Sequence, residues 1–90
     1  MMKKRNFQDK NYIKWRNEVK KRDKHKCRWP KCNSKRRLQA HHIRRWADSI
    51  SVRYDVGNGI TLCKAHHDSI KGKERYYESF FLAILRLKDV

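Results

Sequence analysis

Apolar residues recur at helical spacing near the start of the chain. Tyr12, Trp15 and Val19 stand at positions i, i+3 and i+7, which places them on one face of a helix. We predict that this helix begins at Asn11, as its N-cap, and ends near Asp23. Lysine and arginine fill most of the remaining positions. The pattern is that of an amphipathic helix that covers a core and presents a basic face outward.

The C-terminal third of the chain predicts two further helices. A short helix from about Lys64 to Ile70 is expected to stop near Gly72, because glycine commonly terminates helices. A last helix is predicted from about Glu74 to Leu87. Its apolar stripe, which we assign to the core, consists of Tyr77, Phe80, Phe81, Ile84 and Leu85.

The middle of the chain is β-prone or turn-forming rather than helical. We expect a short strand at Leu38–Ile43 and a second at Ile60–Leu62. Residues 44–57 read as a long connection between these strands. Within that connection, Val52–Tyr54 is rich in β-formers, and we predict a small additional strand there.

Length and composition indicate one small domain with a modest core. We assign residues 1–10 of the 90 to a flexible basic arm and residues 11–90 to the domain. The hydrophobic and the charged fractions are both 38%, so little apolar surface is available for burial. Domains of this size commonly need a staple besides their core. An internal metal site would supply one.

The charge of the chain points to a polyanionic partner. Lys and Arg number 25 and Asp and Glu 9, which gives a net charge of +16. So one-sided a field favours nucleic acid or an anionic membrane surface. No segment approaches the roughly 20 apolar residues of a spanning helix, so DNA is the leading partner. The basic residues Met1–Arg5 are not followed by the apolar stretch of a secretory signal, and we expect a cytoplasmic, reducing location.

Three cysteines stand at metal-ligand spacing. Cys27 and Cys32 lie in a turn-rich knuckle, and Cys63 follows about thirty residues later. In a reducing compartment such cysteines indicate a zinc site rather than disulfides. Structural Zn²⁺ takes four ligands, so one histidine is needed. We favour His66, which gives the usual C-x₂-H step; the alternatives are His67 at C-x₃-H, and His25.

A second set of polar residues lies between and beside the predicted strands. His41 and His42 are adjacent near the end of the first strand, so their side chains leave it on opposite sides. Asn58 precedes the second strand and His67 follows it. Together with the thiols, the imidazoles supply enough ligands for two metal ions, one in a closed structural site and one in an open catalytic site.

The ordered combination of these residues resembles the HNH family of nucleases. The pattern is His41-His42, fifteen residues, Asn58, eight residues and His67, with the knuckle pairs just outside each strand. The resemblance covers roughly Trp15–Lys71. It implies an α+β fold, namely a small ββα-metal domain with flanking N- and C-terminal helices that is stapled by a structural zinc.

The resemblance also implies roles for individual residues. His42 would be the general base that takes a proton from the attacking water. His41 and His67 would bind one catalytic divalent ion, which can be Mg²⁺, Mn²⁺, Ni²⁺ or Zn²⁺. Asn58 would brace the loop and help orient His42 through a backbone carbonyl. Some members carry a further histidine where this chain has Lys71, so only two imidazoles would hold the ion.

The function that the resemblance implies is metal-dependent hydrolysis of DNA phosphodiester bonds, by nicking or by double-strand cutting, with low intrinsic sequence specificity. Arg44, Arg45 and Lys71 flank the site in sequence and are predicted to contact phosphates. The alternative is a zinc-stapled nucleic-acid-binding module without catalysis. Compact nucleases of this kind resemble those of phages and mobile elements, where partner proteins can supply specificity to a monomer or a dimer.

Overall fold

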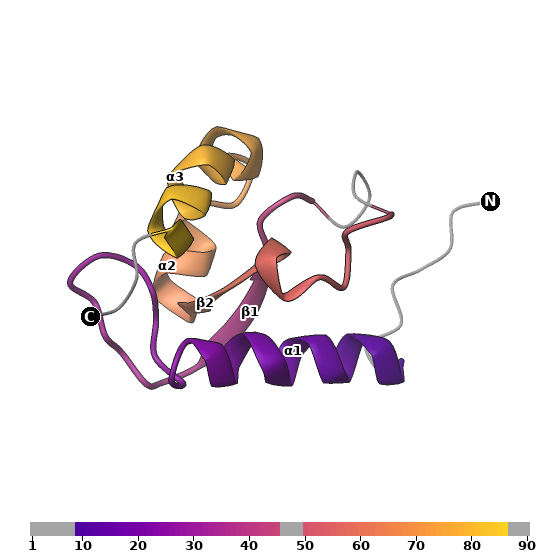
Figure 1. The fold of residues 1–90 in the computed structure, drawn as a ribbon. Helices are drawn as coiled ribbons and strands as arrows, with labels where there is room; N and C mark the ends of the chain where they lie inside the picture. Colours follow the sequence, from indigo (N-terminus) through magenta and orange to yellow (C-terminus); the bar gives the residue numbers. More distant parts are fainter. Residues whose placement is uncertain (1–8, 46–49, 87–90) are drawn as a thin grey trace.

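The computed structural model describes residues 9–45 and 50–86 (Figure 1). Two antiparallel strands form the only sheet in this part of the chain, which confirms the predicted α+β class. None of the described helices is long and apolar enough to cross a bilayer. The elements, in chain order, are α1 (Lys10–Arg22), β1 (Leu38–His42), the 3₁₀ helix η2 (Val56–Asn58), β2 (Gly59–Cys63), α2 (Lys64–Ser69) and α3 (Glu74–Arg86).

Helix α1 begins earlier than its sequence pattern predicted. Asp9, and not Asn11, is the N-cap, and its carboxylate accepts a hydrogen bond of 2.7 Å from the Asn11 amide. Both residue types cap helices well, but a carboxylate is additionally favoured by the positive end of the helix dipole. The helix therefore includes Lys10, the last residue of the predicted basic arm. Residues 1–8 of that arm lie outside the described residues.

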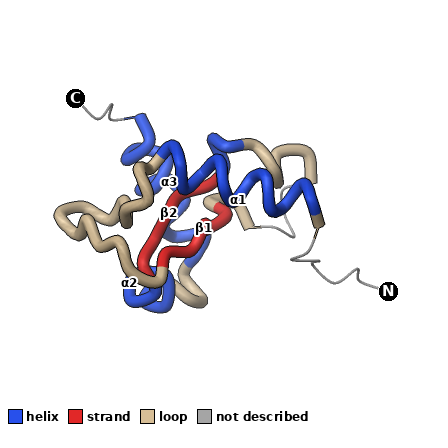
Figure 2. Tube along the Cα trace, turned by 90° about the horizontal axis from the view of Figure 1, so that it is seen from below, coloured by secondary structure: helices blue, strands red, loops and turns tan. Residues whose placement is uncertain are grey.

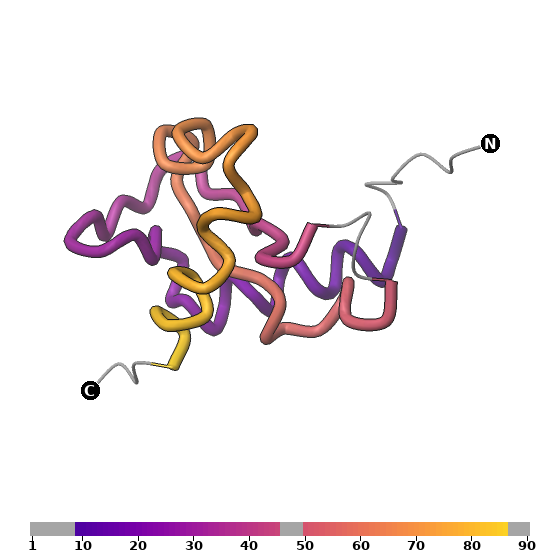
Figure 3. Tube along the Cα trace, turned by 90° about the horizontal axis from the view of Figure 1, so that it is seen from above, coloured from indigo at the N-terminus to yellow at the C-terminus, as the bar shows by residue number. Residues whose placement is uncertain are grey.

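The hairpin lies between two helical layers. Helix α1 packs against one face of β1 and β2, and α2 and α3 lie on the other (Figures 1 and 3). Seen from below, α1 lies across both strands (Figure 2). Because both faces are covered, all five residues of β2 are buried. In the antiparallel register, Leu38 pairs with Cys63 at one end of the hairpin and His42 with Gly59 at the other.

Each layer has its own apolar cluster. Between α1 and the hairpin, Tyr12, Trp15 and Val19 are buried as their helical spacing predicted. On the opposite face, Phe81 of α3 is fully buried against a cluster that includes Ile43, Ile60, Leu62 and Ile70. The predicted α3 stripe is otherwise only partly buried, and Phe80 is 37% exposed.

The predicted small strand at Val52–Tyr54 is wrong. These residues form turns, and the Asp55 amide donates to the Val52 carbonyl at 3.0 Å. Instead of pairing with the hairpin, Tyr54 and Val56 pack against the α1 cluster. Residue propensity favoured a strand here, but burial of these side chains against α1 decided the local structure.

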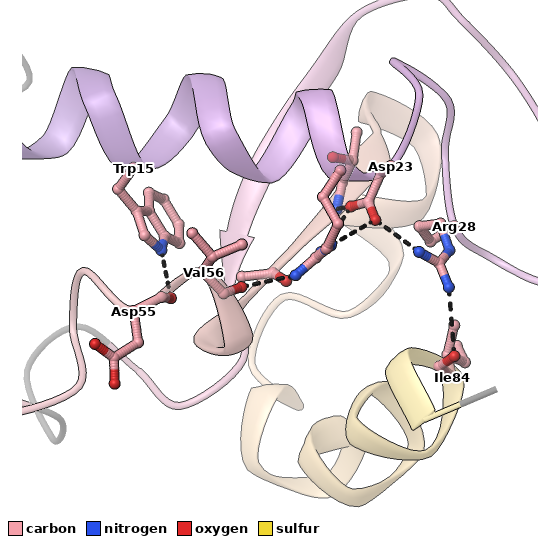
Figure 4. Close-up of polar contacts among 9 residues, drawn as sticks. Trp15, Asp23, Arg28, Asp55, Val56 and Ile84 are labelled. Atoms are coloured by element: carbon pink, nitrogen blue, oxygen red, sulfur yellow. Dashed lines mark hydrogen bonds and ion pairs between the residues drawn. The ribbon is translucent and has the colours of Figure 1, made fainter. Parts of the chain in front are cut away.

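A buried carboxylate, that of Asp23, connects three parts of the fold through hydrogen bonds (Figure 4). The Asp23 side chain is inaccessible to solvent and receives a bidentate pair of hydrogen bonds from Arg22, at 2.8 and 2.9 Å. Arg28 of the knuckle donates to it at 2.7 Å, and the Thr61 amide of β2 at 2.9 Å. Arg22 also donates to the carbonyls of Val56 and Gly59, both at 2.7 Å. One carboxylate thus links α1, the knuckle and β2.

The hydrogen bonds to Asp23 favour its ionised form. Burial by itself raises the pKa of Asp23, but the Arg22 hydrogen bond and charge, with the Thr61 amide, outweigh it and place the pKa below the ordinary 3.8. Since the pKa is lower in the folded state, the resulting stabilisation is complete at neutral pH. It is lost only as the pH falls below about 3.8 through the folded pKa.

We predict that Asp23→Asn lowers the free energy of unfolding at pH 7 by about 3–5 kcal/mol, because two arginines lose a buried partner. Urea unfolding of the zinc-loaded protein measures this. Asp68→Asn is the matched control: it removes a carboxylate that, in the described part of the chain, forms surface ion pairs with Lys64 and Lys71, and we expect little change. Equal free energies of unfolding for Asp23→Asn and the parent would refute this role of the carboxylate.

Gly59 permits the close approach of α1 to the hairpin. A Cβ atom at this position would lie 2.5 Å from Val19 Cγ2 and 2.7 Å from Trp15 Cζ2, closer than side chains tolerate. By contrast, a Cβ on Gly57 would meet nothing within 4 Å. The absence of a side chain at residue 59 therefore sets how near the Trp15 indole comes to β2.

We predict that Gly59→Ala destabilises the protein by about 1–3 kcal/mol, because α1 must shift outward to accommodate the methyl group. Gly57→Ala, two residues away, is expected to change the stability by less than about 1 kcal/mol. Thermal unfolding of both variants tests the difference. Similar melting temperatures for the two variants would contradict the packing described here.

Candidate metal centre and active site

Four potential ligands converge at the Cys63 end of the hairpin. The thiols of Cys27, Cys32 and Cys63 and one imidazole nitrogen of His66 all lie within 4.8 Å of one another. The knuckle after α1 supplies the first two cysteines, the end of β2 supplies Cys63, and the first turn of α2 supplies His66. Among the alternatives for the histidine, His25 and His67 lie outside this group.

The separations within this thiol cluster fit a tetrahedral Zn²⁺ site. Zinc–ligand bonds of about 2.0–2.3 Å in a tetrahedron give ligand–ligand distances of about 3.5–3.8 Å. The observed distances are 3.9 Å from Cys32 Sγ to Cys63 Sγ, 3.6 Å from Cys27 Sγ to His66 Nδ1 and 3.3 Å from Cys63 Sγ to His66 Nδ1. The cluster is therefore compatible with the structural zinc expected from the sequence.

Groups around the cluster orient its ligands. The Trp29 indole stacks on the His66 ring with centroids 4.6 Å apart and planes 4° from parallel, and the Trp29 amide lies 3.4 Å from Cys27 Sγ. Burial raises the pKa of the Cys27 thiol to about 11. Burial also opposes ionisation of Cys63, but hydrogen bonds from the His66 amide, the Cys27 and Cys32 thiols and the Ala65 amide outweigh it and lower the pKa of that thiol. Such outer contacts fix ligands for a metal.

Apart from the thiol cluster, two histidines meet on the α3 side of the hairpin. The rings of His41 on β1 and His67 on α2 lie edge to face, with centroids 5.4 Å apart. Phe81 packs against His41 at 5.5 Å and supplies an apolar wall. At this separation both imidazoles can bind one ion. Consecutive helical residues point about 100° apart, which lets His66 face the thiols while His67 faces His41.

The burial and the pKa of the His67 imidazole favour metal binding. Its Nδ1 atom is buried and has no hydrogen-bond partner within residues 9–45 and 50–86. Burial lowers the pKa of His67 below the ordinary 6.5, and the nearby Lys71 charge acts in the same direction. A neutral imidazole is the form that binds metals. This buried nitrogen, beside a second histidine, fits a divalent ion.

His42 leaves β1 on the opposite side and contacts α1. Its ring stacks on the Trp15 indole, with centroids 3.9 Å apart and planes 12° from parallel. Its Nε2 atom lies 2.9 Å from the Arg53 carbonyl oxygen. Because a carbonyl only accepts hydrogen bonds, Nε2 must carry the proton. In the neutral ring, Nδ1 is then the nitrogen that can accept a proton. The structure thus brings His41 and His67 together and gives His42 a separate environment.

Asn58 forms hydrogen bonds with the backbone that follows β1. Its Oδ1 accepts from the Arg44 amide at 2.8 Å, its Nδ2 donates to the Arg44 carbonyl at 3.3 Å, and its own carbonyl accepts from the Ile43 amide at 2.9 Å. These bonds fix the backbone directly after His42. The carbonyl that contacts the His42 ring belongs to Arg53, a backbone group that leaves no signature in the sequence.

The predicted DNA-binding residues lie on the surface near these histidines. Arg44 and Arg45 directly follow the histidine pair and are exposed. Lys71, beyond α2, is also exposed, and its ammonium group lies 3.3 Å from the Asp68 carboxylate. Arg45 further lines a surface pocket of about 650 Å³ together with Lys73, Arg75 and Tyr76. The charge around this pocket is mainly positive.

Comparison with known families agrees with this arrangement. A family model described as HNH endonuclease matches residues 12–70, which is more than half of the chain. The protein therefore belongs to the HNH endonuclease family. No curated protein and no solved structure matches it. The match covers α1 from Tyr12 onward, the knuckle, both strands and α2, and so contains His41, His42, His67 and the thiol cluster.

We predict that His66→Ala lowers zinc affinity more than about 100-fold, since even losses outside the ligand shell cost 10–100-fold. The melting temperature should fall with it, because metal binding stabilises the fold. His67→Ala, its neighbour on the same helix, is the control and should retain one zinc per chain. Zinc content after dialysis, measured with a colorimetric chelator, distinguishes them. Zinc loss in His67→Ala but not in His66→Ala would reverse the assignment.

Proposed function

We propose that this protein is a metal-dependent DNA endonuclease that hydrolyses phosphodiester bonds, by nicking one strand or cutting both, with low intrinsic sequence specificity. The observation that carries the proposal is the placement of the histidines. His41 and His67 meet in a partly buried pair, and Nε2 of the adjacent His42 lies 2.9 Å from the Arg53 carbonyl oxygen, so that Nδ1 would be the basic nitrogen of the neutral ring. Membership of the HNH family supports nuclease chemistry in general.

The roles of the residues follow from their surroundings. A divalent ion bound by His41 and His67 would polarise the scissile phosphate and stabilise charge on the leaving oxygen. Nδ1 of His42 takes the proton of the attacking water, while its Nε2 proton stays bonded to the Arg53 carbonyl. Asn58 holds the backbone after the base in place through the Arg44 peptide groups.

The thiol cluster has a structural and not a catalytic role in this proposal. Its four protein ligands would complete a tetrahedral zinc and leave no open position for substrate. The three cysteines are free thiols, which the proposed zinc requires. We accordingly place the protein in a reducing, intracellular compartment.

DNA binding rests on charge. The net charge of +16 favours a polyanion, and Arg44, Arg45 and Lys71 lie beside the proposed active site, where they would contact backbone phosphates. Such contacts position DNA without reading its sequence. Specificity would then come from partner proteins, as in nucleases of phages and mobile elements. A non-catalytic zinc-stapled module would explain the charge and the thiol cluster, but not the His41–His67 pair.

We predict that His42→Ala lowers the rate of plasmid nicking by about 10²–10⁴-fold, the usual contribution of a general base. Its zinc content and its affinity for duplex DNA should match those of the parent. His25→Ala is the control, because His25 is exposed and belongs neither to the thiol cluster nor to the proposed active site. Nicking of supercoiled DNA in Mg²⁺ or Mn²⁺, with EDTA as the blank, provides the measurement. Parental nicking by His42→Ala would remove this residue from the mechanism.

A further inference from the structure

We propose that Trp15 of α1 is a positioning residue for His42, holding the plane of the imidazole so that Nδ1 stays directed at the reacting water. The inference rests on the proposed function of His42. Helix α1 would then belong to the active site, in addition to covering the hairpin.

The contact between the two rings is face to face. Trp15 is 1% exposed and His42 6% exposed, and their planes are nearly parallel with centroids 3.9 Å apart. The hydrogen bond at Nε2 fixes one atom of the imidazole and does not by itself set the tilt of the ring about that bond. A flat indole against its face opposes this tilt, because tilting would drive ring atoms into the indole.

Both rings are attached to the same short segment of backbone. The indole Nε1–H donates to the Asp55 carbonyl at 2.8 Å, and His42 Nε2–H donates to the Arg53 carbonyl at 2.9 Å. A hydrogen bond from the Asp55 amide to the Val52 carbonyl closes the turn that carries these acceptors. Two carbonyls two residues apart therefore fix both rings, and the indole keeps the segment that selects the His42 tautomer in place.

The space for this stack is provided by Gly59. This residue pairs with His42 across the hairpin, and a Cβ atom there would collide with the Trp15 indole. Val19 lies on the same face of α1 and is equally buried, but it has no ring to stack on the imidazole. A requirement for burial alone would be met by any large apolar residue at position 15; positioning His42 requires a flat ring.

The test compares Trp15→Leu and Trp15→Phe with Val19→Ala as a control for lost packing. Two experiments are made on zinc-loaded protein. The first gives kcat and KM for plasmid nicking at saturating Mn²⁺. The second records the ¹⁵N chemical shifts of the His42 ring near pH 8, where an ordinary imidazole is neutral. The ¹⁵N shifts report the tautomer without any catalysis, so they test the positioning role even if nicking is absent.

We expect Trp15→Leu to lower kcat at least about tenfold with little change in KM, and to shift His42 from the Nε2–H form toward a mixture of tautomers. Trp15→Phe keeps a flat ring and should recover much of both. Val19→Ala should resemble the parent in kcat and tautomer despite a lower melting temperature. The proposal is overturned if Trp15→Leu keeps the parental tautomer and kcat. If Trp15→Leu does not fold, a folded Trp15→Phe variant that loses kcat tenfold or more, or loses the Nε2–H tautomer, in spite of its flat ring overturns it.

Discussion

The buried Asp23 carboxylate fixes how the elements of this small structure fit together. It joins the end of α1, the knuckle and β2 through two arginines and one backbone amide. A domain with so modest an apolar core has few other ways to fix its layers. Arg22 continues the connection to the carbonyls on either side of Asn58. The position of α1, and with it the Trp15 indole beside His42, follows from this network.

The hairpin separates two sites with different chemistry. Its Cys63 end carries the thiol cluster, and its His42 end carries the proposed base. Helix α2 serves both sites, since His66 faces the thiols and its neighbour His67 faces His41. A zinc held at one end would therefore fix α2, and through it the second histidine of the other site. Such a coupling would let 90 residues support the proposed structural and catalytic sites together.

Local sequence patterns predicted much of this arrangement. They could not predict the contacts between residues that are distant in the sequence. Helical spacing placed α1 and α3, and C-x₂-H spacing selected His66 as the histidine of the thiol cluster. The same reasoning misplaced the α1 cap at Asn11 and assigned a strand to Val52–Tyr54, where packing against α1 overrides β-propensity. The spacing of Trp15 indicated burial only, since periodicity does not show which ring lies opposite. The Arg53 carbonyl could not be predicted because every residue has one.

We propose that this chain cuts DNA with a divalent ion distinct from a zinc held by the thiol cluster. The most direct measurement is nicking of supercoiled plasmid by protein loaded with one zinc per chain, with and without added Mg²⁺, Mn²⁺ or Ni²⁺. We expect nicks that appear with at least one added ion, vanish with EDTA, and are absent in His67→Ala although that variant keeps its zinc. Absence of nicking with every ion, or equal nicking by His67→Ala, would contradict it.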